Sequence, residues 1–152
     1  FGVGLEFSLA CDFRIVTRNS QLSLPEMKIG MIPGSGGSVR LARMIGLSRV
    51  KDMIMRGKRI SGEEAFKWGL ASEVVESLKL EEATSKLVKE LCSVSPLAQR
   101  AIKTVLNTSQ DAPLHVAIEL EGETYGRLRS SNDFKEGVSS FVEKRKPVYK
   151  GN

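Results

Sequence analysis

The sequence predicts an α/β region followed by an all-helical region, and two observations support this fold class. In the first half of the chain, short segments with strand character alternate with segments of helical spacing, and glycine or proline separates them. After about residue 78, four amphipathic helical patterns follow one another and no further strand is evident. With 152 residues, 41% of them apolar, the chain is the size of one domain and can fill a core. We expect two parts, residues 1–78 and 79–152.

The first part is expected to contain three short extended segments and four helices. Extended segments are predicted at residues 13–16, 21–24 and 70–75, and helices within residues 2–10, 38–45, 48–56 and 61–68. Ser48 is expected to cap the third helix. Ser61 and Glu64 have the spacing of a capping box, in which hydroxyl and carboxylate each satisfy a free backbone N–H. Gly69 is expected to end that helix as its C′ residue.

The second part is expected to consist of helices alone, at residues 80–91, 96–106, 114–129 and 133–143. Ser95-Pro96 is a good start signal, because proline at the first helical position loses no donor that the helix needs. No apolar segment is long enough to span a bilayer.

Cysteine and histidine usage excludes several kinds of chemistry. Cys11 and Cys92 match no metal or redox spacing, and we expect two buried, reduced thiols in an intracellular protein. His115 is the only histidine, and it lies on a helix with apolar neighbours, where a structural role is the usual one. A zinc site or a histidine-dependent triad is therefore not expected. Carboxylates and backbone amides remain as the main chemical resources.

The net charge of +5 is unevenly distributed along the chain. Residues 1–60 contain ten Lys or Arg against four Asp or Glu, and the last twelve residues are also basic. Such an excess can attract an anionic ligand or a nucleic acid, and charge alone does not choose between them. A solvated basic surface with no specific partner is equally compatible with the composition.

Glu6 and Glu26 are the candidate catalytic carboxylates. Glu6 follows a Gly-Val-Gly turn in the first turn of a helix, where free N–H groups form an anion-binding corner; it could alternatively complement the helix dipole. Glu26 follows Pro25 after a strand, which is also the setting of an exposed loop residue. Residues 32–37 form a glycine-rich loop that can present amides to a phosphate, carbonyl or water, or serve as a plain turn. The spacing permits the two glutamates to converge.

Several segments occur in one order along the chain and together form a recognisable pattern. They are Gly2-Val3-Gly4-Leu5-Glu6-Phe7-Ser8-Leu9-Ala10-Cys11-Asp12, Leu24-Pro25-Glu26, Gly30-Met31-Ile32-Pro33-Gly34-Ser35-Gly36-Gly37, Arg40-Leu41, Ala65 with Gly69-Leu70, and Asp133, Glu136-Gly137, Phe141, Glu143-Lys144-Arg145, Pro147 and Tyr149-Lys150-Gly151. The combination closely resembles the crotonase (enoyl-CoA hydratase/isomerase) superfamily over the whole chain. The fold this implies is a crotonase-like ββα spiral core, of which this chain has the C-terminal part, followed by an α-helical trimerisation region.

The resemblance also implies the parts of a site. Glu6 and Glu26 match the two catalytic glutamates of family hydratases. The Val3 N–H matches one of two oxyanion-hole amides, although the family usually has glycine there. Gly34 is expected to help hold the water or the pocket wall, and Phe141 and Lys144 to approach the nucleotide of coenzyme A, often from a neighbouring subunit. The second amide belongs to a segment ahead of Phe1, and we expect further chain there.

The expected function is therefore that of an enoyl-CoA hydratase, a hydro-lyase that adds water to trans-2-enoyl-CoA thioesters in fatty-acid or related metabolism. Coenzyme A would arrive as part of the substrate, with no other cofactor and no metal. A homotrimer or hexamer in the cytoplasm, or in the mitochondrial matrix of a eukaryote, is expected. An enoyl-CoA isomerase or another crotonase-fold acyl-CoA enzyme is one alternative. A non-catalytic scaffold or RNA-binding protein is the other, although nucleic acid is not the expected partner.

Overall fold

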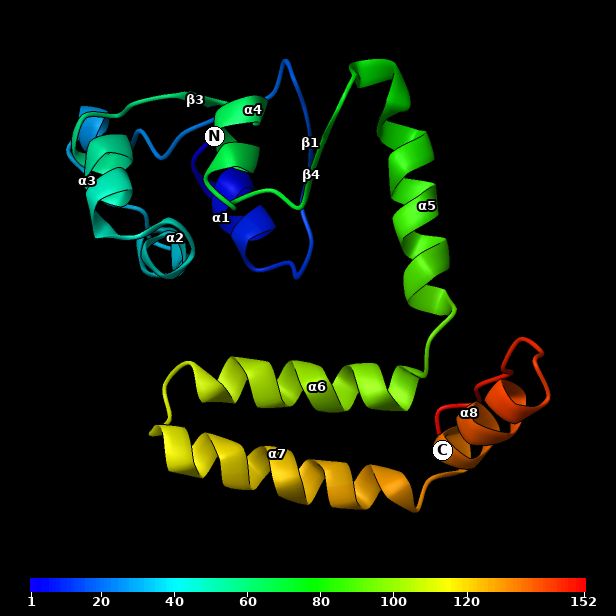
Figure 1. Ribbon diagram of the computed structural model, residues 1–152. Helices are drawn as coiled ribbons and strands as arrows, with labels where there is room; N and C mark the ends of the chain where they lie inside the picture. Colours follow the sequence, from blue (N-terminus) through cyan, green and yellow to red (C-terminus); the bar gives the residue numbers. More distant parts are fainter. The chain divides into compact units, whose positions relative to one another are not determined.

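A computed structural model describes residues 1–152, and it divides into two compact units, Phe1–Ser85 and Lys86–Asn152 (Figure 1). The first unit contains all the strands, and the second contains only helices and loops. The sequence placed the division at residue 78, which lies in the short 3-10 helix η2 (Ser77–Lys79). The division between the units falls a few residues later, inside helix α5 (Leu80–Cys92).

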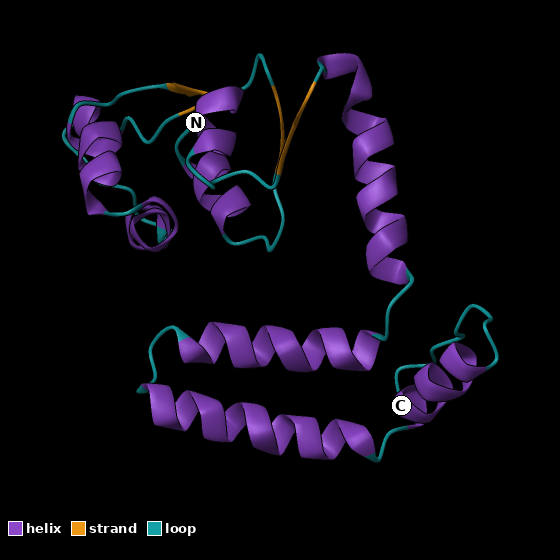
Figure 2. Cartoon of the chain, viewed as in Figure 1, coloured by secondary structure: helices purple, strands orange, loops and turns teal.

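The first unit alternates short strands with short helices (Figure 2). Its elements are α1 (Val3–Leu9), β1 (Ile15–Thr17), β2 (Gln21–Leu22), η1 (Glu26–Ile29), α2 (Gly37–Ile45), α3 (Leu47–Met55), β3 (Ile60–Ser61), α4 (Gly62–Lys67) and β4 (Glu73–Val75). Strand β1 pairs in parallel with β4, with Ile15 opposite Glu73, whereas β2 pairs antiparallel with β3. Segments 58 residues apart (Ile15 and Glu73) and 40 residues apart (Gln21 and Ser61) along the chain thus lie side by side.

The capping box of α4 is confirmed. The backbone N–H of Glu64 donates to Ser61 Oγ at 3.1 Å, and the Ser61 N–H donates to Glu64 Oε2 at 3.0 Å. The predicted C′ residue is confirmed too, since Gly69 has a φ of +75°. The Leu70 N–H then reaches back to the carbonyl of Ala65 at 2.9 Å, which completes a Schellman motif.

Three sequence expectations for this unit need correction. The first strand begins at Ile15 rather than at residue 13. The start of α3 is not capped by Ser48: the helix begins at Leu47, its N-cap is Gly46, and no side chain caps it. Strand β3 and the 3-10 helices were not predicted at all. Elements of two to four residues are too short to show a periodic pattern of apolar residues in the sequence.

The core of the first unit is formed by apolar side chains from α1 to α4, from β2 and β3, and from the loops beside them. The buried members are Leu5, Leu9, Leu22, Leu24, Leu41, Ile45, Val50, Met53, Ile54, Ile60, Ala65, Leu70 and Ala71. Leu5 and Leu9 anchor α1 into this core through one face, since residues four apart lie one above the other on a helix. The N-terminus of α1 forms part of the site described below.

The second unit consists of α6 (Pro96–Ser109), α7 (Leu114–Arg129) and α8 (Asn132–Val142) with the last turns of α5. The helices α6 and α7 pack side by side (Figure 1). Ser95 caps α6 through the N–H of Ala98, with Pro96 at the first position as predicted. Val105 is the one buried aliphatic or aromatic side chain of this unit, whereas Ile102, Leu106, Ile118 and others are about half exposed.

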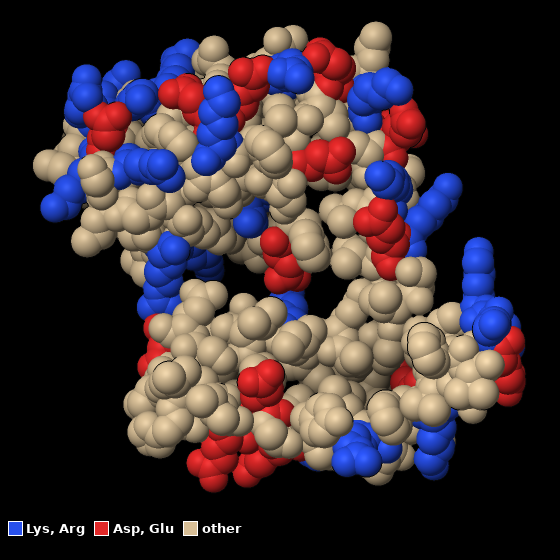
Figure 3. Space-filling view, in the orientation of Figure 1, with Lys and Arg blue, Asp and Glu red and all other residues tan.

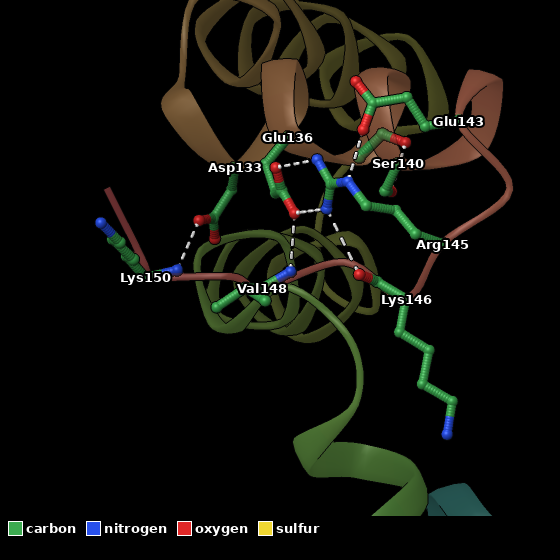
Figure 4. A network of polar contacts seen from close by, with 9 residues as sticks. Asp133, Glu136, Ser140, Glu143, Arg145, Lys146, Val148 and Lys150 are labelled. Carbon is green, nitrogen blue, oxygen red and sulfur yellow. Dashed lines mark hydrogen bonds and ion pairs between the residues drawn. The ribbon is translucent and has the colours of Figure 1, made fainter.

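The C-terminal segment is fastened to α8 by two carboxylates (Figure 4). Asp133 accepts hydrogen bonds from the backbone N–H groups of Lys150 and Gly151, at 2.9 and 3.0 Å, and from the hydroxyl of Ser95 at 2.6 Å. Glu136 accepts the Val148 N–H at 2.8 Å and pairs bidentately with Arg145. The Ser95 hydroxyl and then the backbone donors lower the pKa of Asp133, and Arg145 lowers the pKa of Glu136 to about 2.

Both cysteines are exposed, free thiols, so the expectation that they are buried is wrong. Cys11 lies in the turn after α1, and Cys92 is the last residue of α5. The only histidine, His115, is exposed on α7. None of the helices is long and apolar enough to cross a membrane.

Candidate active site

The N-terminus of α1 presents a backbone donor that the helix does not use. Gly2 is the N-cap, and its φ of +53° belongs to the region that favours glycine. Its own N–H donates to the carbonyl of Ser23, and its carbonyl accepts the Glu6 N–H, both at 3.0 Å. Val3 is the first helical residue, so its N–H has no partner within the helix. The Val3 side chain is 70% exposed.

Glu6 is a buried carboxylate held by the glycine-rich loop. Its side chain is only 4% exposed although it lies in the first turn of α1, where it was predicted. Oε1 accepts hydrogen bonds from the backbone N–H groups of Ser35, at 2.8 Å, and Gly37, at 2.9 Å. Both hydrogen bonds end on Oε1, so they leave the lone pairs of Oε2 unused. The carboxylate is thus fixed by one oxygen and can accept from a ligand with the other.

Glycine at position 37 makes room for this carboxylate. A Cβ added at Gly37 would lie 2.6 Å from Glu6 Cγ and 2.7 Å from Oε1, closer than any real Cβ contact. The sequence left two interpretations of the loop open: amides that bind a phosphate, a carbonyl or a water, or a plain turn. Two of the loop amides instead bind a carboxylate of the protein itself, and Ser35 and Gly37 were not singled out for this role. The sequence did contain one indication of this role. Glu6 occupies a helix position among buried residues, and a buried carboxylate needs hydrogen-bond donors from other parts of the chain.

Glu26 is the second carboxylate of the site, and one of its oxygens has no partner. It opens η1 directly after Pro25 and is half-buried. Oε2 is fully buried and accepts no hydrogen bond. A buried polar atom without a partner is uncommon in folded proteins and calls for an explanation, of which a catalytic role is one. This orphaned oxygen could not be foreseen from the sequence.

The start of α1 connects the two carboxylates. A Cβ on Gly2 would lie 2.9 Å from Glu26 Oε1, so this carboxyl lies directly against the residue before Val3. The same Gly2 accepts the backbone N–H of Glu6. Gly34, exposed at the beginning of the loop, immediately precedes the Ser35 amide that binds Glu6. Of the predicted residues in the first unit, Glu26 thus lies against the residue that precedes Val3, and Glu6 is bound by the residue that follows Gly34.

Phe141 and Lys144, the two predicted nucleotide contacts, belong to the second unit. Phe141 is 85% exposed near the end of α8. Lys144 is the only non-glycine residue with a positive φ, +54°. Its N–H donates to the carbonyl of Phe141, and the Arg145 N–H donates to that of Ser140, which is a Schellman motif with lysine in the position usually held by glycine.

Positive charge gathers near the first unit's helices. Figure 3 shows Lys and Arg side chains over the part of the surface where α2 and α3 lie in Figure 1. Some of these cations are already engaged: Asp52 pairs with Arg56 and Lys58, and Arg49 lies over the ring of Trp68. The hydrogen bond from Arg56, and next to it the charge pairing, lower the pKa of Asp52 despite its partial desolvation.

Comparison with known proteins supports the family that the sequence suggested. The family model described as "Enoyl-CoA hydratase/isomerase" matches residues 1–152. A carnitinyl-CoA dehydratase from Salmonella typhi is 37% identical over 99% of this chain and 59% of its own length. The crystal structure of an enoyl-CoA hydratase from Bacillus anthracis is 40% identical with a TM-score of 0.96, over 99% of this chain and 58% of that one.

A further solved structure, DspI from Pseudomonas aeruginosa, is 35% identical with a TM-score of 0.93, over 98% of this chain and 57% of that one. The chain thus spans about three fifths of the length of the relatives it matches. Across that span both the fold and the sequence agree with them. From its crotonase-like fold and from the match over its whole length, this chain belongs to the enoyl-CoA hydratase/isomerase (crotonase) family.

Proposed function

We propose that the protein is an enoyl-CoA hydratase that reversibly adds water to a trans-2-enoyl-CoA thioester. The observation that carries the proposal is a pair of carboxylates at one helix start, each with an oxygen to spare. Glu6 is tethered through Oε1 alone, and Glu26 has a buried Oε2 with no partner. Hydration needs one group to take a proton from water and another to give a proton to carbon, and this pair provides both.

The Val3 N–H supports the polarisation of the thioester. It is a donor that the helix does not use, at the positive end of α1, and it follows Gly2, which lies against Glu26. A hydrogen bond from it to the thioester oxygen makes C3 electrophilic and stabilises the enolate that forms at C2. Because the donor is a backbone group, valine in place of the usual glycine leaves it intact. Its 70% exposed side chain instead narrows the approach to the helix start.

In the proposed reaction the O–H bond of water breaks as its oxygen bonds to C3. Glu6 Oε2 orients that water and receives its proton, and Glu26 delivers a proton to C2, so that the elements of water are added overall. Gly34 forms part of the pocket wall beside the loop that holds Glu6. Coenzyme A is a part of the substrate, and the proposal requires no other cofactor and no metal.

Phe141 and Lys144 are proposed to contact the nucleotide of coenzyme A. Both are exposed, and the lysine is presented on a left-handed turn. A homotrimer or hexamer is proposed for the assembly, because the second unit exposes many aliphatic and aromatic side chains and buries few. In such an assembly these two residues can serve the site of a neighbouring subunit.

The proposed activity can be tested by adding crotonyl-CoA to purified full-length protein and measuring hydration. We expect the absorbance of the conjugated thioester to fall as water adds, and Glu6→Gln or Glu26→Gln to lower kcat by about 10²- to 10⁴-fold, the usual contribution of a general acid or base. Glu121→Gln, an exposed residue of α7, is the matched control and should retain full activity. Unchanged absorbance together with conversion of a 3-enoyl-CoA would instead support an isomerase.

A second candidate substrate follows from the relatives. Because a carnitinyl-CoA dehydratase is 37% identical over 99% of the chain, carnitinyl-CoA should be assayed in the dehydration direction. Turnover of this substrate in preference to crotonyl-CoA would place the activity in that class. Absence of any turnover, combined with salt-sensitive binding of RNA, would support a non-catalytic role.

A further inference from the structure

The turn that holds Glu6 is itself held from its outer side by Arg40. This residue is the fourth of α2, and its Nη1 donates to the carbonyl of Ser35 at 2.8 Å. Its backbone N–H donates to the carbonyl of Gly36 at 3.0 Å. A Cβ on Gly36 would lie 2.5 Å from the same Nη1, so the guanidinium lies directly against that residue.

Arg40 binds the peptide between Ser35 and Gly36. This peptide lies between the two N–H groups that donate to Glu6. Oε1 binds the N–H of Ser35 on one side of this peptide and the N–H of Gly37 on the other. A hydrogen bond to the Ser35 carbonyl restrains the orientation of the intervening planar peptide, and so restrains the backbone rotations at Ser35 and Gly36 that aim the neighbouring N–H groups. Gly36, at a φ of +84°, has the conformational freedom to rotate this plane unless something restrains it.

Arg40 is suited to this task because it acts from the surface. Its side chain is exposed, whereas the neighbouring Gly37 and Leu41 of the same helix are buried. Removing the guanidinium therefore leaves the core of the unit unchanged. The substitution would remove the hydrogen bond from Arg40 to the Ser35 carbonyl. This hydrogen bond is charge-assisted, and such hydrogen bonds are stronger than neutral ones.

We propose that Arg40 is a positioning residue that acts through Glu6. By fixing the 35–36 peptide it keeps both amides on Oε1, and Oε2 is thereby aimed at the reacting water. The inference rests on the proposed function for its kinetic consequence, since Glu6 is there the group that deprotonates water. It rests on the contacts of Arg40, Ser35 and Gly36 alone for its structural consequence.

The kinetic test compares Arg40→Ala, Arg40→Lys and Glu6→Gln in full-length protein with crotonyl-CoA. Arg40→Ala should lower kcat by about tenfold or more while KM changes little, because a small misplacement of a catalytic group slows chemistry. Arg40→Lys, which retains one cationic donor, should recover part of the loss. Lys51→Ala removes a similar charge from an exposed position of α3 and should behave as wild type.

A double mutant decides whether Arg40 acts through Glu6. If it does, Arg40→Ala combined with Glu6→Gln has the kcat of Glu6→Gln alone, because the positioned group is already inactive. Losses that multiply would overturn the proposal, and so would an Arg40→Ala enzyme with wild-type kcat. A change confined to KM would also contradict it.

A measurement that needs no turnover separates this inference from the proposed function. The amide proton resonances of Ser35 and Gly37 report their hydrogen bonds to Oε1, and Glu6→Gln should shift both. We expect Arg40→Ala to move them in the same direction, with Lys51→Ala leaving them in place. Unmoved resonances in Arg40→Ala would refute the role of Arg40 even in an active hydratase. Should the wild type fail to hydrate crotonyl-CoA, moved resonances would still support it.

Discussion

At the scale of single residues, the site depends on close approaches that only glycine permits. Gly37 lies against the Glu6 side chain, and Gly2 lies against Glu26. Neither contact is visible in the sequence, because the partners are more than twenty positions apart. The family resemblance predicted that Glu6 and Glu26 are the catalytic pair. It did not predict that Glu6 is tethered by loop amides or that Glu26 keeps a buried, unpartnered oxygen.

Replacing Gly37 with alanine tests the first of these approaches. The added Cβ would overlap Glu6 Cγ, so the carboxylate must move off the Ser35 and Gly37 amides. We expect kcat to fall by about 10- to 100-fold, as small misplacements of catalytic groups do, and the free energy of unfolding to fall by about 1–3 kcal/mol from overpacking. Steady-state kinetics and urea denaturation measure the two effects.

The control is Gly126→Ala in α7, where an added Cβ meets no atom within 4 Å. Alanine is the better helix former, so this variant should be at least as stable as the wild type and fully active. A Gly37→Ala enzyme with normal kcat would show that the Glu6 geometry is not needed for turnover.

At the scale of elements, the sequence predicted helices well and short strands poorly. A helix of nine or more residues repeats its apolar spacing at least twice, as α2 and α6 do, and this signal is local. Strand β3 has two residues and exists because β2 lies opposite, which no local pattern encodes. The cap predicted at Ser48 was wrong for a similar reason. A serine near a helix start has the sequence pattern of an N-cap, but the backbone decides which residue is the N-cap, and here it is Gly46.

The two serines make a matched test of helix capping. Ser61→Ala removes the acceptor of the Glu64 N–H, and we expect it to lower the free energy of unfolding by about 1 kcal/mol. Ser48→Ala removes no cap and should change stability by less than about 0.5 kcal/mol. Equal effects in denaturant titrations would contradict the assignment of the α3 start to Gly46.

The fastening of the C-terminal segment to α8 predicts a dependence of stability on acid. The pKa of Glu136 is about 2 in the folded protein against an ordinary value of 4.5. A lowered folded-state pKa contributes stability that is present above pH 4.5 and is lost as the pH falls toward 2. We therefore expect Glu136→Gln to be less stable than the wild type at pH 7, with the difference narrowing toward pH 2. Glu121→Gln, outside the network, should show no such narrowing.

Denaturation midpoints at several pH values measure this effect. A stability difference between wild type and Glu136→Gln that stays constant from pH 7 to pH 2 would show that the carboxylate does not titrate as its contacts with Arg145 and Val148 require.

At the scale of the whole molecule, the two units differ in how they bury apolar surface. The first has a contiguous core, whereas the second leaves most of its large apolar side chains at least partly exposed. We expect part of this exposed apolar surface to be covered by a partner, because large exposed apolar patches often mark interaction sites. The sequence patterns predicted the helices of the second unit, but amphipathicity alone cannot say which partner covers the apolar face.

We expect full-length protein to sediment as a trimer or hexamer, and Ile118→Glu to shift it toward smaller species. Ile118 is 58% exposed on α7, and a charge there would be desolvated on assembly. Analytical ultracentrifugation measures the distribution. Glu121→Gln, on the same helix, should assemble as the wild type does. A wild-type monomer, or an Ile118→Glu protein that assembles normally, would exclude α7 as the contact.

The glycine beside each glutamate also constrains how this site could be redesigned. Shortening Glu6 to alanine would vacate the volume into which a Cβ at Gly37 would project. A side chain at position 37 that overlaps Glu6 in the present protein would then have room. Substitutions at positions 6 and 37 should therefore be coupled, and a library that varies one position at a time would miss pairs of side chains that fit only together.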